Sequence, residues 1–266
     1  MTDWEQHLEK LRKIISDSKK LANKKFDQFL SEVLQSLYDL QFCFRELEWV
    51  HEDEFGEEFT ECRIILSRRV LSLLRLYEVL NSQVPHALIN IQEAAIWAEE
   101  GEEGGTGEMV DYLEEDINDD QTFLFNNVIP MTIVVNLVSA IETFLDATVK
   151  CVSDIAEPNG TMDGRKYDNI NFHIQTLKKL YGIPIKLDKS TNKHLDNMRE
   201  FRNQFLHELG RDLPDQVQKV LKDLYGSTEL KDCNSMFVLH AFEATLEIVK
   251  MISDHFKPWR EKQLTI

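Results

Sequence analysis

One stretch of this chain constrains the fold more than any other, the apolar run that begins at Pro130. Its first two-thirds is hydrophobic nearly all round a helix, whereas a surface helix carries a single apolar stripe. Because Asn136, Glu142, Asp146 and Lys150 interrupt the run before about 20 apolar residues accumulate, a core helix is favoured over a membrane span. The run therefore predicts a buried central helix and no membrane partner.

The remaining apolar residues recur every three or four positions, which is the period of an amphipathic helix. From Phe26 to Leu47 the steps of four and three form a seam suited to antiparallel packing on another long helix. With 42% apolar residues and few Gly or Pro, the chain is expected to be an all-α antiparallel helical bundle. The expected helices around the central one cover about residues 3–22, 26–47, 59–81, 85–97, 167–181, 192–209, 214–225 and 233–256, and the tail from Lys257 is expected to be loose.

An acidic segment divides the chain. Residues 99–120 hold eleven Asp and Glu, no Lys or Arg, and four glycines. This self-repelling composition favours a solvated linker, although it could also dock a basic partner or mimic nucleic acid. We therefore expect an N-terminal helical region over 1–127, ending in this linker, and a C-terminal helical domain over 128–266.

Charge is distributed unevenly along the chain. The formal net charge is −17 and the pI is near 4.9, which argues against a general nucleic-acid coat. From Arg165 to Lys222, however, 12 Lys and Arg stand against 7 Asp and Glu, so this stretch is +5 and the rest of the chain is −22. This one region has a field that could attract a polyanion such as RNA.

Cysteine spacing and carboxylate patterns give no metal or cofactor site. The four cysteines, Cys43, Cys62, Cys151 and Cys233, form no C-x-x-C pair, so reduced thiols in a cytoplasmic protein are expected. The polar N-terminus does not resemble a secretory signal. A single Glu48-x-x-His51 step is half of what a di-iron bundle needs, and the run from Asp116 lacks the Gly and Glu of a calcium loop.

The expected helix over 192–209 carries the most informative residues of the chain. The polar run from Asp188 to Thr191 offers N-cap residues, and Gly210 offers a C-terminal stop. One face is apolar, formed by Leu195, Met198, Phe201, Phe205, Leu206 and Leu209.

Arg202 falls inside that apolar face, and Asn203 and His207, four residues apart, lie together on its flank. A guanidinium in an apolar stripe is costly unless an anion or acceptor meets it. Glu142, deep in the central helix, needs a cation for the same reason. Glu142 is therefore expected to pair with Arg202, either to orient it for chemistry or as an ordinary structural ion pair.

The pattern Arg202-Asn203-x-x-x-His207 resembles the signature of HEPN domains, all-α modules that include many metal-independent ribonucleases. The apolar helix over 129–145 also resembles the first main helix of that family. The resemblance covers roughly residues 128–256. It implies a HEPN-like C-terminal half, to which this chain adds long N-terminal helices.

The resemblance implies a chemistry that these residue types can perform. Metal-independent cleavage uses the 2′-OH of RNA as nucleophile and leaves a 2′,3′-cyclic phosphate and a 5′-OH. His207 titrates in the right range to act as base or acid. Arg202 suits the phosphoryl oxygens, and Asn203 is placed to orient the imidazole or to hydrogen-bond the phosphate.

In the family, two such helices face each other across a dimer. The resemblance therefore implies a homodimer in which Arg202 and His207 of both chains line one cleft that binds RNA. It also suggests a toxin or anti-phage defence effector with an antitoxin or regulatory protein as partner. Some toxin branches carry Tyr after the motif His, where an antitoxin modifies it. Glu208 stands there in this chain, which argues against that modification but leaves a partner antitoxin open.

Two other readings of the sequence stay open. One is a catalytically inert HEPN-type dimer that acts as a binding or regulatory module. The other is an unrelated helical adaptor whose acidic segment docks a partner. The chain has no Walker loop, G-x-G-x-x-G, H-E-x-x-H or G-x-S-x-G motif that would indicate a different enzyme class.

Overall fold

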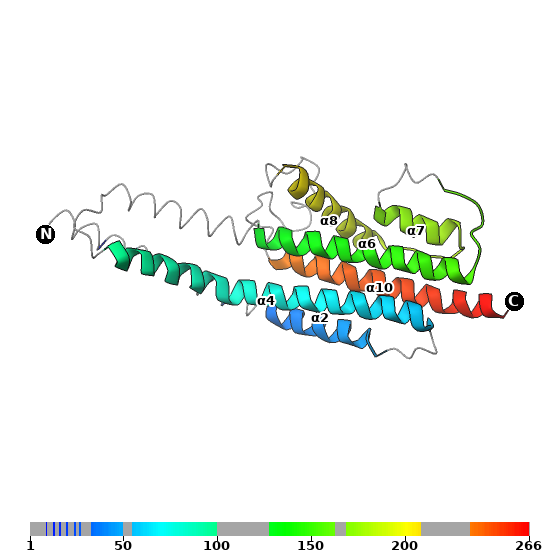
Figure 1. Cartoon of the computed structure of the whole chain (residues 1–266), viewed down its shortest axis with the longest axis horizontal. Coiled ribbons are helices and arrows are strands. Elements are labelled where there is room, and N and C mark those ends of the chain that lie inside the picture. The colour runs from blue at the N-terminus through cyan, green and yellow to red at the C-terminus, as the bar shows by residue number, and fades with distance from the viewer. Residues whose placement is uncertain are drawn as a thin grey trace.

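The computed structural model of the chain describes residues 33–49, 55–99, 128–162, 169–208 and 235–265, and six single positions between 9 and 27. This part of the chain is all-α and has no strand, as predicted. Its six helices, shown in Figure 1, are α2 (Gln35–Glu46), α4 (Glu57–Glu99), α6 (Ile129–Ile155), α7 (Asn169–Lys179), α8 (Lys189–Glu208) and α10 (Ser235–Leu264).

Helix α6 is the centre of the bundle. It contacts α4, α7, α8 and α10, and the side chains of Ile133, Val134, Leu137 and Val138 are fully buried. The predicted buried central helix is therefore confirmed. Among the described helices, α6 alone has the length and composition of a membrane span. The core helix of a soluble protein has the same composition, and half of the most apolar part of α6 is buried inside the bundle.

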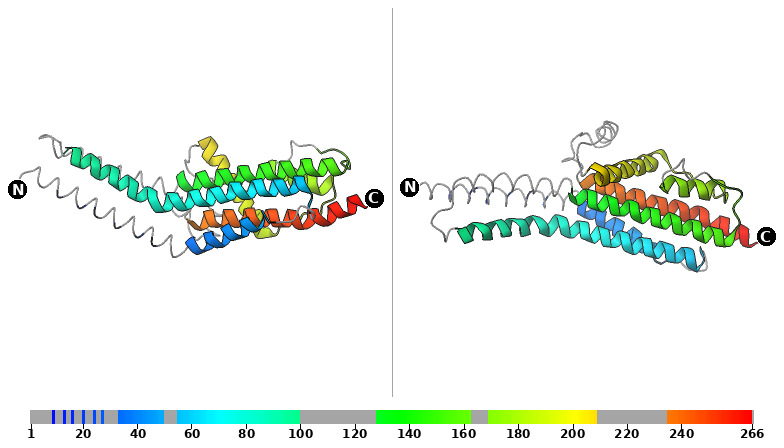
Figure 2. Two further views of the ribbon diagram at one scale, coloured as in Figure 1. Left: turned by 60° about the horizontal axis from the view of Figure 1, so that its bottom comes forward. Right: turned by 45° about the horizontal axis from the view of Figure 1, so that its top comes forward.

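Helices α2 and α4 pack together on one side of the bundle, and α7 and α8 lie on another (Figure 2). The seam predicted for the second helix is buried wherever it is described, at Val33, Leu37, Leu40, Phe44 and Leu47. At the α2–α4 contact, the Ser67 hydroxyl donates a hydrogen bond of 2.6 Å to the Phe44 carbonyl oxygen. The same core joins α2 and α4 to the helices that follow residue 128. The proposed division of the chain at residue 127 stays a prediction.

Helix α4 differs from its prediction. The sequence predicts two helices, over 59–81 and 85–97, with a break at Pro85, but the structure has one continuous helix over Glu57–Glu99. A proline inside a helix removes one backbone hydrogen bond and bends the axis without always ending it. No glycine or turn sequence adjoins Pro85 to add a second break. Figure 2 shows α4 bending and continuing past the other described helices.

Helix α10 also extends further than predicted. The tail from Lys257 was expected to be loose, but the helix continues through Pro258 to Leu264. The Trp259 ring is 7% exposed, and its indole N–H donates a hydrogen bond of 2.8 Å to the Tyr181 carbonyl oxygen. Tertiary contacts therefore stabilise the last turns of α10, which the helical period of apolar residues does not predict.

Several predicted segments fall wholly or largely outside the described residues. Of the first predicted helix, over 3–22, only single positions are described, and these are helical. The acidic linker after Glu99, the short helix over 214–225, Gly210 and Cys233 are not among the described residues.

Candidate functional site

A capping network fixes where α8 begins. The backbone N–H groups of Ser190 and Thr191 donate to Asp188 Oδ1 at 2.8 and 3.0 Å, and the Thr191 hydroxyl donates to Oδ2. The hydrogen bonds from Thr191 and, with a smaller effect, the one from Ser190 lower the pKa of the Asp188 carboxyl. The expected N-cap is therefore Asp188, which satisfies donors that a helix leaves unpaired at its first turn.

The described part of the apolar face of α8 is buried as predicted. Leu195, Met198 and Phe201 are at most 5% exposed. The Phe201 ring packs on the Phe237 ring of α10 with 4.6 Å between centroids. This packing sets the rotation of α8 about its axis, and so decides which side chains of the motif face α6.

Arg202 faces α6 and meets Glu142. Its Nη1 donates a hydrogen bond of 2.7 Å to Glu142 Oε1, and the two side chains are 26% and 18% exposed. The two residues that the sequence paired are therefore in contact. A charge-assisted hydrogen bond of this length joins the motif helix to the central helix in a half-buried setting.

The structure says less about the other two motif residues, Asn203 and His207. Asn203 is exposed next to Arg202 on α8. His207 lies in the described backbone of α8, but its side chain is outside the described residues. The structure thus joins two of the four predicted site residues, and it leaves the catalytic roles of all four as predictions.

A histidine that the sequence did not single out lies near the pair. His173, on α7, is half-buried, and its Nδ1 atom is buried without a hydrogen-bond partner among the described residues. Burial lowers the pKa of His173, and the carboxylates of Asp146 and Glu142 oppose that effect. In the sequence, His173 lies next to the apolar positions of α7 and belongs to no motif. Its position in the sequence therefore gives no reason to link it with Glu142.

A pair of histidines joins α8 to α10. The rings of His194 and His240 lie 5.1 Å apart between centroids. Burial lowers the pKa of His194, and the charge of His240 lowers it further. This contact also came from the tertiary structure and not from any motif.

The surroundings of Arg202 contain both signs of charge. Residues 169–208 hold seven Lys and Arg and four Asp and Glu, so the described part of the basic region keeps a positive excess. On α8, Arg199 forms ion pairs with Asp196 at 3.4 Å and Glu200 at 3.5 Å. On α6, Lys150 pairs with Asp146 at 2.7 Å.

Described residues of α7 and α8 line a small hollow between the two helices. A hollow of about 10 Å³ there is lined by residues such as Asn171, Asn192 and Arg199, which is room for about one water molecule. The described residues contain no group of three or more His, Cys, Asp or Glu that could hold a metal ion.

Comparison of the chain with models of protein families, with curated proteins and with solved structures found no match.

Proposed function

We propose that this chain is a metal-independent endoribonuclease of the HEPN type, with Arg202, His207 and Asn203 as catalytic residues and Glu142 as the residue that orients Arg202. The observation that carries the proposal is the contact between Arg202 and Glu142, with the exposed Asn203 beside it. An ordered guanidinium next to an exposed polar side chain is what recognition of a phosphodiester requires.

The geometry of Arg202 is compatible with binding a phosphate. A guanidinium carries five N–H donors, and its hydrogen bond to Glu142 in the described structure uses one of them. Glu142 restrains one edge of the Arg202 guanidinium, and another edge can donate hydrogen bonds to the phosphoryl oxygens of RNA. Positive charge at that place stabilises the pentavalent transition state, while His207 takes or gives a proton.

The proposal includes a homodimer, because one histidine does not easily serve as acid and base in the same step. Two copies of α8 facing each other would bring two Arg202 and two His207 side chains to one cleft. RNA is then the substrate, the site needs no metal, and the setting is a cytoplasmic toxin or anti-phage defence effector with a possible antitoxin or regulatory partner.

One observation favours a second function, a catalytically inert HEPN-type dimer that binds or regulates. The Glu142 carboxylate neutralises Arg202 in the structure, and a buried structural ion pair has the same geometry. In that case Arg202 holds α8 on α6 and does not contact RNA.

The deciding experiment is RNA cleavage in excess EDTA, with total RNA and transfer RNA as substrates. Wild type is compared with His207→Ala, Arg202→Ala and Asn203→Ala, and Asn192→Ala is the matched control. Asn192 is an exposed asparagine on the same helix. The nuclease predicts fragments that end in 2′,3′-cyclic phosphate from wild type and Asn192→Ala alone. Absence of cleavage with a stable dimer in light scattering supports the inert module. Absence of both cleavage and dimer overturns the composite site.

A further inference from the structure

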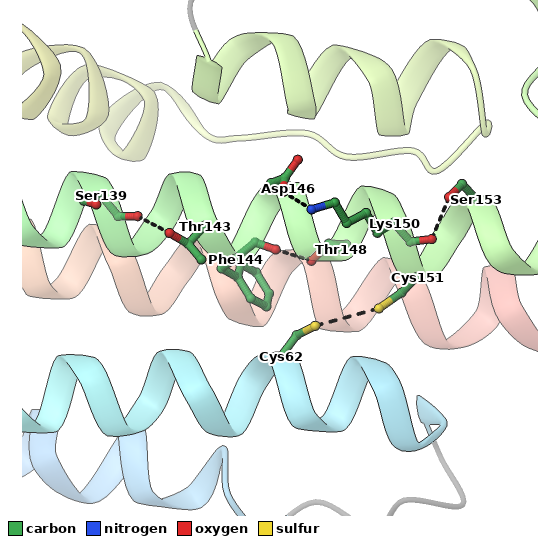
Figure 3. Close-up of polar contacts among 9 residues, drawn as sticks. All are labelled: Cys62, Ser139, Thr143, Phe144, Asp146, Thr148, Lys150, Cys151 and Ser153. Carbon is green, nitrogen blue, oxygen red and sulfur yellow. Dashed lines mark hydrogen bonds and ion pairs between the residues drawn. The ribbon is translucent and has the colours of Figure 1, made fainter.

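Two cysteines that are far apart in the sequence meet between α4 and α6. Cys62 Sγ and Cys151 Sγ lie 3.7 Å apart across the interface, although 89 positions separate the residues in the chain (Figure 3). Cys62 is half-buried, whereas Cys151 is 7% exposed. The more accessible thiol therefore belongs to α4, and the sheltered one belongs to the central helix.

The interface between α4 and α6 is hollowed beside Cys62, on a side that Cys151 does not line. A cavity of about 70 Å³ between α4 and α6 is lined by Cys62 and by side chains that include Thr143, Phe144 and Ala147. Bond formation requires the two sulfur atoms to close from 3.7 Å to about 2.05 Å, so the side chains or the helices that carry them must move. The cavity gives a small oxidant a place beside the Cys62 sulfur.

The two thiols are chemically unequal. The hydrogen bond from Cys151 lowers the pKa of Cys62, while burial and the carboxylates of Glu61 and Glu58 oppose this effect. The same hydrogen bond, burial and the charge on Cys62 raise the pKa of Cys151, and Glu58 and Asp154 add to the rise. Because the thiolate is the nucleophile, Cys62 is suited to react first and Cys151 to react second.

We propose that Cys62 and Cys151 are a peroxide-sensitive thiol pair that forms a reversible disulfide between α4 and α6. Cys62 is the reacting thiol and Cys151 the resolving one. The proposal rests on the juxtaposition of the two sulfur atoms and does not depend on the proposed nuclease.

The chemistry balances with hydrogen peroxide as oxidant. Cys62 loses its thiol proton, and its sulfur attacks one peroxide oxygen. The O–O bond breaks, and the departing hydroxide takes up that proton as water, which leaves Cys62 as a sulfenic acid. The Cys151 sulfur then attacks the Cys62 sulfur, and the hydroxyl leaves with the Cys151 proton as a second water. Two thiols are oxidised to one disulfide, and one peroxide is reduced to two waters.

The disulfide would link the central helix to α4 and close a long loop of chain. Closure of a long loop restricts the unfolded chain strongly, so the oxidised protein should unfold at a higher temperature. Cys151 lies nine residues after Glu142 on α6, roughly 13–14 Å along the helix axis. The link therefore restrains α6, the helix whose Glu142 accepts the hydrogen bond from Arg202 of α8.

The first test uses the full chain with Cys43→Ser and Cys233→Ser, so that only the proposed pair remains. Hydrogen peroxide treatment should lower the mass by two hydrogen atoms. Non-reducing digestion should release one peptide pair that links residues 62 and 151, and dithiothreitol should reverse both changes. The wild-type chain is mapped in parallel in case the double variant folds poorly. Failure to find the 62–151 peptide in either protein, or linkage mainly between two chains, overturns the proposal.

The second test separates the roles of the two thiols by trapping sulfenic acid with dimedone. Cys151→Ser should accumulate the adduct at Cys62, roughly tenfold more than Cys62→Ser accumulates at Cys151. Cys43, half-buried on α2, is the matched control thiol in both variants. Equal labelling of Cys62 and Cys43, or preferential labelling of Cys151, contradicts the assignment.

The third test measures the unfolding midpoint of oxidised and reduced protein. Oxidation should raise it by roughly 5–15 °C in the wild type and leave it unchanged in Cys62→Ser and Cys151→Ala. An unchanged or lowered midpoint in the oxidised wild type overturns the stabilising role of the disulfide.

Discussion

Two side-chain contacts of α6 with neighbouring helices differ in whether the sequence predicts them. On the α8 side, Arg202 and Glu142 form a half-buried ion pair. On the α4 side, Cys62 and Cys151 bring two thiols together at an apolar interface, three residues beyond the stacked ring of Phe59. The first contact satisfies charges that would be costly to bury alone, whereas the second involves small side chains that are stable in a core with or without each other.

The comparison also separates stability from chemistry. The α4 side is built mainly on aromatic and aliphatic packing, with Arg63 buried as well, whereas the described contact on the α8 side includes the ion pair of Arg202 with Glu142. Changes on the α4 side should therefore act mainly on folding, and changes at Arg202 should act mainly on activity. The following predictions test that division, from the largest expected effect to the smallest.

Phe59→Ala should destabilise the fold by about 3–5 kcal/mol. Its ring is 1% exposed and stacks on Phe256 with 4.0 Å between centroids, so truncation leaves a cavity where α4, α6 and α10 meet. Chemical denaturation measures the free energy of unfolding. Phe42→Ala is the control, because Phe42 is 59% exposed on α2 and should change stability by less than about 0.5 kcal/mol. Similar losses for both variants would refute the packing argument.

Arg202→Ala should reduce RNA cleavage by about 10²–10³-fold if the proposed nuclease is correct, because it removes the charge that stabilises the transition state. The measurement is the initial rate on a defined RNA in EDTA. Arg199→Ala is the matched control on the same helix, since Arg199 forms ion pairs with Asp196 and Glu200 of α8 itself. Equal losses in both variants would indicate a general effect of positive charge on RNA binding.

Glu142→Gln should cost about 1–2 kcal/mol of stability, because it leaves Arg202 half-buried without an anion. A double-mutant cycle with Arg202→Ala isolates the interaction between the two side chains. We expect a coupling energy of about 1 kcal/mol, reduced from the value for a fully buried pair because both side chains retain some exposure. A coupling energy near zero would mean that the ion pair does not hold α8 on α6.

Acid sensitivity should be concentrated on the α7–α8 side. The pKa values of His173 and His194 are lowered in the folded protein, so the unfolded chain binds more protons as the pH falls below the ordinary histidine value of about 6.5. Stability should therefore fall as the pH is lowered from about 7 through that region, and this part of the loss is complete below the folded-state pKa values.

The change of unfolding free energy with pH measures this effect, and we expect His194→Gln to remove less than about 1 kcal/mol of it. The pKa of His173, followed by NMR, should fall further in Glu142→Gln, because the carboxylate that opposes the shift is gone. A rise in the pKa of His173 in that variant would contradict the electrostatic account of the site.

The sequence by itself determined the helical class, the central place of α6, the buried seam of α2 and the meeting of Arg202 with Glu142. Each of these follows either from the helical period of the apolar residues or from a charged residue in an apolar stretch that needs a partner. Both features can be read from the sequence. The cap of α8 at Asp188 was also among the candidates, because carboxylate side chains accept hydrogen bonds from the first N–H groups of a helix.

Only the tertiary structure decided the rest. Pro85 and Pro258 both lie inside long helices, and at the second of them Trp259 docks the end of α10 on Tyr181. The contact between Cys62 and Cys151 and the influence of Asp146 and Glu142 on the pKa of His173 depend on how α4, α6 and α7 pack. Cysteine and histidine are tolerated in many half-buried positions, so their presence in a sequence does not specify a neighbour, and it is the packing of helices that supplies one.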